Sequence, residues 1–216
     1  MRVLLYSTAI YPKVDGVANR VKHHIRALVA LGHQVLVLCP YDSAPSLYEG
    51  AQVLRLPAFV PLDYDESQLS YPFPLMTLNR VFREFRPDII HFIGPEFVLI
   101  PFLLLSRYYK VPILVSYHFY VRAFLNSMPF PMRMLFTWMT WMEMACNFAD
   151  LVICPSKPMM NILRDIGMRC EDIWPPAVDI QQFSPSYYDH DLRSKVRASP
   201  RARRPRCCSS PVSGRD

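Results

Sequence analysis

Hydrophobic residues alternate along the chain between short, almost wholly apolar runs and longer stretches in which they recur at helical spacing. A short apolar run bounded by turn residues is typical of a strand that is buried on both faces of a sheet. The predicted strands are Arg2–Ser7, Gln34–Cys39, Val53–Leu56, Asp88–Ile93, Pro112–Tyr117, Asp150–Cys154 and Ile173–Trp174.

The stretches between these strands predict helices, because their apolar side chains return every three or four residues. Gly32 and Gly167 are helix stop signals, and Ser156 stands where a helix N-cap is expected. The predicted helices are 17–31, Leu75–Phe85, Phe97–Tyr109, Phe130–Phe148 and 157–166, with a loop over Pro57–Pro74. Repeated β-α-β units of this kind predict an α/β fold, a Rossmann-like parallel sheet with helices on both faces.

Ligands of such sheets bind beyond the carboxyl ends of the strands. The loops expected at that edge are Tyr11–Gly16, Gly94–Glu96, His118–Asn126 and Pro155–Lys157. Gly16 precedes a helix and allows a phosphate to approach backbone N–H groups, although an ordinary tight turn would also place glycine there. His118 and Glu96 each follow a buried strand, which suits chemistry as well as a structural role. His91 lies inside a strand and is expected in the core.

Cofactor and metal signatures are absent from the sequence. The chain has six glycines and no GxGxxG pattern, which disfavours an NAD-dependent oxidoreductase. None of the six cysteines falls in a CxxC or zinc spacing, so we predict buried, reduced thiols. His23 and His24 are adjacent on a helix and therefore point in different directions, so we interpret them as helix surface and expect no metal site.

The net charge of +6 is concentrated at the C-terminus. Residues 193–216 carry eight basic residues and one acidic residue, so the first 192 residues carry a net −1. The Arg/Pro/Ser/Cys composition of 188–216 is typical of translated GC-rich non-coding sequence, and we interpret this basic tail as disordered or as an artefact of gene prediction. Residues 193–216 have no aromatic residue for base stacking, so no nucleic-acid partner is expected, and a nucleic-acid binder would lose its affinity when 193–216 are deleted.

Apolar runs are too short to span a bilayer, and the start of the chain lacks the pattern of a signal or transit peptide. We therefore expect a cytoplasmic protein. A plastid location would require a segment that precedes Met1.

Five segments in one order resemble the N-terminal domain of the family-4, GT-B fold glycosyltransferases, over roughly residues 1–187. They include the run Asp15-Gly16-Val17-Ala18-Asn19-Arg20-Val21, the run Val111-Pro112-Ile113-Leu114-Val115-Ser116-Tyr117-His118, and a linker-like stretch from Pro176 to Pro185. The other two segments are Arg86–His91 and Ala149–Ser156. The first two runs look closest to the sulfolipid synthase and mannosyl-lipid transferase branch.

The resemblance implies one half of a GT-B fold, in which two Rossmann-like domains close over a nucleotide-sugar and transfer the sugar with retention of configuration and without a metal. It implies that His118 contacts the sugar at the reaction centre and that Asp15, Gly16 and Val17 lie against the donor phosphates, with Asp15-Gly16 replacing the family's glycine pair. The residues that we assign to the acceptor are Arg20, Glu96, Tyr117, Tyr120 and Arg122.

The family's donor-binding domain has no counterpart in the 216 residues, so we expect little or no transfer by this chain alone. The alternative is a non-catalytic module that binds lipid or a partner protein. Met128–Met144 holds six methionines and two tryptophans. It fits a core helix, and it also fits peripheral membrane contact beside a lipid acceptor.

Overall fold

A computed structural model describes residues 1–59, 68–94, 96–118 and 143–176. It also describes a few single positions, which are 120, 122, 133, 134, 137, 140, 178, 180, 184, 186, 190, 191 and 194. The chain divides into two compact units, Met1–Pro176 and Ala177–Asp216. The sheet and its covering helices lie in the first unit, while the predicted basic tail lies almost wholly outside the described residues.

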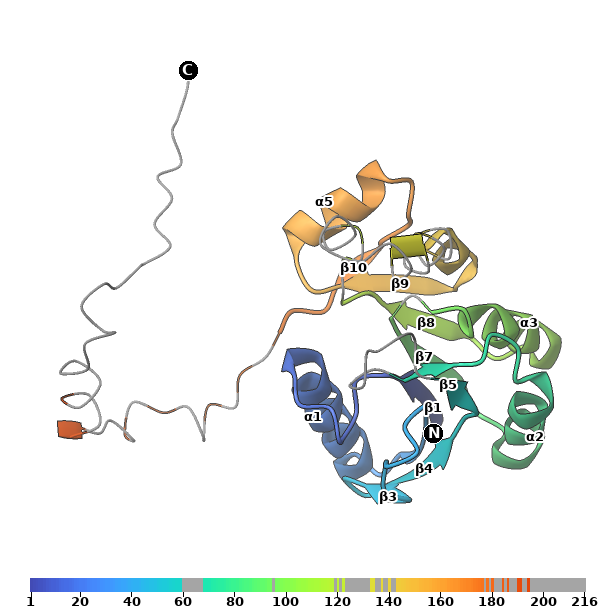
Figure 1. Cartoon of the computed structure of the whole chain (residues 1–216), viewed down its shortest axis with the longest axis horizontal. Coiled ribbons are helices and arrows are strands. Elements are labelled where there is room, and N and C mark those ends of the chain that lie inside the picture. The colour runs from blue at the N-terminus through green and yellow to red at the C-terminus, as the bar shows by residue number, and fades with distance from the viewer. Residues whose placement is uncertain are drawn as a thin grey trace. The chain divides into compact units, whose positions relative to one another are not determined.

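An eight-stranded sheet forms the centre of the first unit, in the order β10-β9-β8-β7-β1-β2-β4-β3 (Figure 1). All its pairings are parallel except that of β3 with β4. Its strands are β1 (Arg2–Ser7), β2 (Gln34–Cys39), β3 (Leu47–Tyr48), β4 (Ala51–Arg55), β7 (Ile89–Ile93), β8 (Ile113–Ser116), β9 (Leu151–Cys154) and β10 (Asp172–Ile173). A second, antiparallel pair is β5 (Ala58–Phe59) with β6 (Leu69–Ser70).

Helices cover both faces of this sheet, as predicted. They are α1 (Gly16–Ala30), α2 (Leu75–Phe85), α3 (Leu99–Tyr109) and α5 (Lys157–Asp165), with a 3₁₀ helix, η3 (Met144–Phe148). Successive residues of β1 point to opposite faces, so Val3 and Leu5 pack under α1, while Leu4 and Tyr6 join the core beneath α2 and α3. Figure 1 shows α1 on one side of the strands and α2 with α3 on the other.

The direction of chain winding reverses between β1 and β7. The chain leaves β1 through α1 for β2 on one side, and it leaves β7 through α3 for β8 on the other side. The loops after β1 and β7 therefore diverge at the carboxyl edge, which is where open α/β sheets bind ligands. Gly94, the first residue after β7, has a φ of 102° that L side chains rarely adopt, and this conformation turns the chain toward Glu96.

The strands predicted from sequence all exist, with ends within two residues of those expected. The short strand β3 was not predicted. It arises because Glu49 and Gly50, with φ values of 50° and 83°, form the two-residue turn of a hairpin. The predicted loop Pro57–Pro74 also contains β5 and β6.

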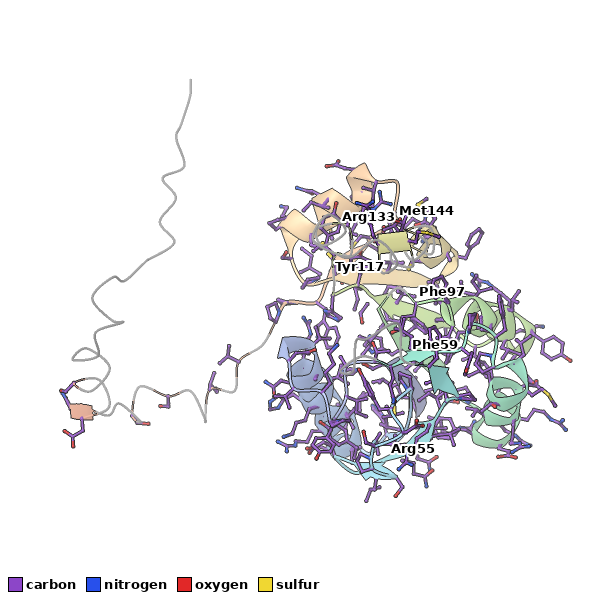
Figure 2. All side chains as sticks on the ribbon, in the orientation of Figure 1. Arg55, Phe59, Phe97, Tyr117, Arg133 and Met144 are labelled. Atoms are coloured by element: carbon purple, nitrogen blue, oxygen red, sulfur yellow. The ribbon has the colours of Figure 1, made fainter. Side chains whose placement is uncertain are left out.

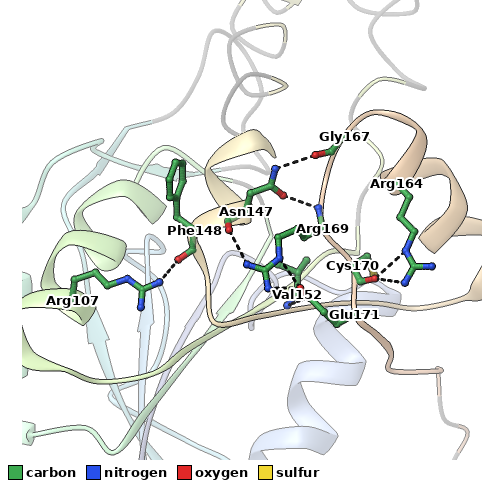
Figure 3. Close-up of polar contacts among 9 residues, drawn as sticks. All are labelled: Arg107, Asn147, Phe148, Val152, Arg164, Gly167, Arg169, Cys170 and Glu171. Atoms are coloured by element: carbon green, nitrogen blue, oxygen red, sulfur yellow. Dashed lines mark hydrogen bonds and ion pairs between the residues drawn. The ribbon is translucent and has the colours of Figure 1, made fainter.

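The predicted α-helix Phe130–Phe148 is wrong over its last five residues, which form the 3₁₀ helix η3, while residues 130–142 lie mostly outside the described positions. The side chain of Asn147 explains the tighter winding, since it accepts from Arg169 N at 2.6 Å and donates to Gly167 O at 3.0 Å (Figure 3). Arg107 Nη2 also donates to Phe148 O at 2.7 Å. The 3₁₀ helix η3 is thus bonded to α3 and to the chain after α5. Short 3₁₀ helices are common as connectors of this kind.

Buried thiols are confirmed for the four cysteines in the described part of the chain, which are Cys39, Cys146, Cys154 and Cys170; all four are free and buried. Cys207 and Cys208 lie outside it. No helix among the described residues is long and apolar enough to cross a bilayer.

Candidate functional site

A buried carboxyl lies at the reversal point of the sheet. Glu96 is 6% exposed, and its Oε2 accepts a hydrogen bond of 2.6 Å from the hydroxyl of Tyr6 on β1. The same hydroxyl lies 3.0 Å from Ser70 Oγ on β6. Phe92 of β7 stacks on the Tyr6 ring with centroids 4.6 Å apart, so the phenol is held in place from the side of the sheet.

Burial governs the protonation of this carboxyl. Desolvation raises the pKa of Glu96 from 4.5 to about 7, against the opposing effects of hydrogen bonds from Tyr6 and Thr8 and of the charge of Lys13. Near neutral pH the group can therefore donate or accept a proton, which is the property expected of a residue that handles a hydroxyl group.

The first loop ends in a capped helix start. Asp15 is the N-cap of α1, and its Oδ1 accepts from Ala18 N at 2.7 Å. Gly16 is the first residue of α1, and a Cβ added there would meet no atom within 4 Å. Free backbone N–H groups at a helix start favour an anion. This local geometry is compatible with the prediction that Asp15, Gly16 and Val17 lie against the donor phosphates, which stays a prediction.

We expect Asp15→Ala to lower the free energy of unfolding by about 1 kcal/mol, because the variant loses the N-cap hydrogen bond. Asp15→Asn is the matched control, since asparagine caps as well as aspartate and should stay within a few tenths of a kcal/mol of the parent. Urea unfolding of both variants measures the effect. Equal losses in the two would show that charge, and not the cap, stabilises this helix start.

A cluster of rings lies on the α1 face of the sheet and is here named the His–Trp cluster: His24, His91, His118 and Trp174. His24 of α1 lies 3.1 Å from His91 Nδ1 on β7, and His91 Nε2 lies 2.9 Å from Ser116 Oγ at the end of β8. The indole of Trp174 packs against all three imidazoles, with ring centroids 5.0 to 5.5 Å apart. His118 Nε2 is buried and has no hydrogen-bond partner among the described residues.

Arg20 of α1 packs against the Trp174 ring of the His–Trp cluster. Its guanidinium carbon lies 3.8 Å from the centroid of the Trp174 ring. Its Nη2 donates to the carbonyl oxygen of Trp174 and, at 3.1 Å, to that of Pro175. The geometry combines a cation–π contact with backbone hydrogen bonds, so Arg20 is engaged with the chain that leaves the sheet.

The imidazoles of this cluster are neutral at physiological pH. Burial lowers the pKa of His118 and of His24 to about 4, and the nearby Arg20 charge adds to the effect. Burial holds the pKa of His91 well below its usual value, and the neighbouring His24 and His118, followed by Arg20, lower it further. A neutral imidazole can donate one hydrogen bond and accept another, which suits recognition of a sugar hydroxyl.

Tyr117, Tyr120 and Arg122 lie on the chain that follows β8. Tyr117, labelled in Figure 2, is fully buried and donates from its hydroxyl to Glu143 Oε1 at 2.6 Å. Arg122 Nε donates to the other oxygen of Glu143 at 2.9 Å, and Glu143 itself is fully buried. Tyr120 packs against the core beneath α3. The acceptor contacts assigned to these three residues stay predictions.

The structure brings His118 and Arg20 together around Trp174 and places Glu96 on Tyr6, on the opposite face of the sheet. Sequence reasoning missed Tyr6 and Trp174 as site residues. The strict alternation of strand faces could have assigned Tyr6, since it points to the face opposite Leu5. Nothing local to Trp174 indicates its contacts, which depend on residues about 55 to 155 positions away.

The interpretation of His24 as helix surface is wrong. Residues adjacent on a helix are about 100° apart, so His23 is directed away while His24 turns toward β7 and meets His91. The prediction that His91 belongs to the core is confirmed, at 4% exposure. In the part of the chain that the structure describes, no three His, Cys, Asp or Glu side chains group as metal ligands.

A comparison with protein families matches the chain to Glycosyltransferase Family 4 over residues 14–182. The chain belongs to glycosyltransferase family 4. This match spans the helix start at Gly16, Glu96 and the whole His–Trp cluster. The resemblance read from the five sequence segments is therefore confirmed.

Two relatives of this family-4 chain are named for the sugar residue that they transfer. The chain is 29% identical over 200 residues to a GDP-mannose-dependent alpha-mannosyltransferase of Mycobacterium tuberculosis, and the match covers 90% of this chain and 52% of that protein. It is 27% identical over 191 residues to a sulfoquinovosyl transferase of Arabidopsis thaliana, covering 85% of this chain and 36% of that protein. The chain thus spans about half the length of the mannosyltransferase and about a third of the plant enzyme.

A solved structure confirms the fold. Sucrose-phosphate synthase from Thermosynechococcus elongatus superposes with a TM-score of 0.67 at 16% identity, covering 92% of this chain and 53% of that one. The predicted Rossmann-like half of a GT-B fold is therefore the observed fold.

Proposed function

We propose that this family-4 chain is the acceptor-side half of a retaining glycosyltransferase, which transfers a sugar from a nucleotide-sugar to a hydroxyl group of a lipid or sugar without a metal ion. In that reaction the acceptor oxygen bonds to the anomeric carbon while the bond from that carbon to the nucleoside diphosphate breaks, and the proton of the acceptor hydroxyl passes to the departing diphosphate. The relative named as GDP-mannose-dependent supports a nucleotide-sugar donor. A further relative, named alpha-monoglucosyldiacylglycerol synthase, of Streptococcus pneumoniae, supports a lipid acceptor.

One observation carries the proposal. The Nε2 atom of His118, at the carboxyl edge of the sheet, is buried without a partner among the described residues. A buried polar atom without a partner is costly, and a ligand hydroxyl would satisfy it. Because the low pKa of about 4 keeps this imidazole neutral, it can bond a sugar hydroxyl without placing a second positive charge beside Arg20.

Two further groups have roles in this proposal. The N-terminus of α1 at Gly16 provides backbone N–H groups for the donor phosphates. Glu96, with its pKa near 7, lies at the reversal point of the sheet and would contact the acceptor hydroxyl. Peripheral membrane contact through Met128–Met144 stays a prediction, because most of that segment lies outside the described residues.

The test is a binding titration of the labelled chain by NMR, with GDP-mannose and UDP-glucose as donor probes and with diacylglycerol vesicles and free sugars as acceptor probes. We expect the signals of His118 and Gly16 to move on donor addition, and His118→Ala to weaken binding by about tenfold, because one hydrogen bond to the sugar is lost.

His23→Ala is the matched control, since it removes a neighbouring imidazole of α1 that lies outside the His–Trp cluster contacts. It should leave donor binding unchanged. Equal weakening by the two variants, or donor-induced shifts confined to residues far from the carboxyl edge, would refute the proposal. Shifts caused by diacylglycerol but not by free sugars would identify a lipid acceptor.

A further inference from the structure

Trp174 lies near the end of the first unit and also belongs to the His–Trp cluster. It follows β10 directly, two residues before that unit ends at Pro176. Its indole also lies within the His–Trp cluster, with its centroid 5.5 Å from that of the His118 ring and an interplanar angle of 65°. The last residues of the unit are therefore in direct contact with the candidate sugar-binding imidazole.

The backbone at Trp174 is held as firmly as its ring. Arg20 donates to the carbonyl oxygens of Trp174 and Pro175 while its guanidinium covers the indole. Arg20 lies one turn after Gly16, the first residue of α1. The same side chain thus ties the exit of the chain from the sheet to the helix that begins at the candidate phosphate site.

The His118 ring depends on packing for its orientation, because its Nε2 has no hydrogen-bond partner among the described residues. The torsion that turns an imidazole is broad, so a ring without a polar anchor at this atom is oriented by the surfaces it touches. The indole supplies one of those surfaces. Besides His118, the charged and titratable groups that contact the indole of Trp174 are Arg20 and His24 from α1 and His91 from β7.

We propose that Trp174 is a positioning residue for His118, and that through the Arg20 contact it links the orientation of this imidazole to the course of the chain as it leaves the sheet. The proposal rests on the proposed function, in which His118 meets the sugar. A shift of the described residues Trp174 and Pro175 away from Arg20 would withdraw the indole from the ring of His118.

Histidine NMR titration of the 216-residue chain tests this without any sugar. In Trp174→Ala, water replaces the indole, so the pKa of His118 should rise from about 4 toward 6.5, by at least about one unit. Trp174→Phe keeps an aromatic surface and should give an intermediate value. If Trp174→Ala does not fold, Trp174→Phe carries the test, and an unchanged titration of His118 in that folded variant overturns the proposal.

Arg20→Lys tests the link to the chain exit, because lysine keeps the positive charge but loses the planar fork that holds two carbonyls and the ring. We expect it to shift the His118 signals and to broaden those of Trp174. Arg164→Lys is the matched control, since Arg164 also donates twice to a backbone carbonyl, that of Cys170 (Figure 3). It should leave His118 unchanged.

Thermal unfolding of each variant separates positioning from stability. A purely structural Trp174 would lower the melting temperature while the titration of the folded protein stayed the same, and that result would overturn the proposal. A shifted His118 titration combined with unaltered GDP-mannose binding in His118→Ala would instead reject the proposed function and retain the positioning role of Trp174.

Discussion

Replacing Glu96 by glutamine is expected to stabilise the protein at alkaline pH and to leave its stability at acid pH nearly unchanged. The pKa of Glu96 is raised from 4.5 to about 7, so the folded state holds this proton more tightly than the unfolded state does. The favourable contribution is complete below pH 4.5 and is lost as the pH rises through 7. The parent should therefore lose about 3 kcal/mol of stability over that range through this one group.

Glu96→Gln removes the titration but keeps an oxygen that can accept from the Tyr6 hydroxyl. Urea unfolding at about pH 5 and about pH 8 measures the difference, and the variant should exceed the parent only at the higher pH. Identical pH slopes in the two proteins would show that the carboxyl is not desolvated as the structure has it.

Glu49→Gln is the matched control, because the pKa of Glu49 is shifted in the direction opposite to that of Glu96. A hydrogen bond from Arg26, together with the Arg26 and Lys22 charges, lowers the pKa of Glu49 below 4.5. That carboxylate stabilises the fold above its unfolded pKa, and the stability is lost as the pH falls. Its removal should thus weaken the protein slightly at neutral pH, by less than about 1 kcal/mol, as expected for a partly exposed ion pair.

The second large effect is expected at the buried carboxylate of Glu143. Arg122→Met leaves this fully buried group with Tyr117 but without the cation that lies 2.9 Å away. We expect a loss of about 2 kcal/mol in the free energy of unfolding, which is less than for a wholly buried pair because Arg122 itself is partly exposed.

Restoring neutrality should recover part of that loss. The double variant Arg122→Met with Glu143→Gln removes the uncompensated charge and keeps an acceptor for Tyr117, so it should be more stable than Arg122→Met alone. Arg107→Met, which breaks the more exposed pair with Asp150, is the control and should cost under about 1 kcal/mol. A double variant no better than the single one would contradict the assignment of an ion pair. Denaturant unfolding of the three variants decides this.

The sheet could be predicted from sequence because its strands are buried on both faces and therefore appear as apolar runs, as Leu4 and Leu5 of β1 illustrate. The hairpin at Glu49 could not, because positive φ at a glutamate is rare and its residue type does not signal it. The 3₁₀ helix η3 was missed because its winding is fixed by Asn147 and its distant partners in the loop after α5.

Motif position predicted the candidate site only in part. His118 and Glu96 were found because each directly follows a strand at the carboxyl edge of the sheet. Trp174 and the true environment of His24 could not be found this way, since both depend on α1 packing beside β7 and on the chain returning to it after β10. Local patterns carry no information about contacts between residues so far apart in sequence.

The two outermost strands of the large sheet, β3 and β10, are each two residues long. An outer strand with free backbone groups is a template on which another extended chain can add, and short outer strands give such a chain few bonds to form. Over the described part of the chain, the long apolar strands that dominate this sequence are all interior ones. The short outer strands therefore disfavour fibril formation by the folded protein, although it has many segments rich in valine, leucine and isoleucine. We expect these segments to be prone to aggregation only during folding, before β1, β2 and β7 have paired.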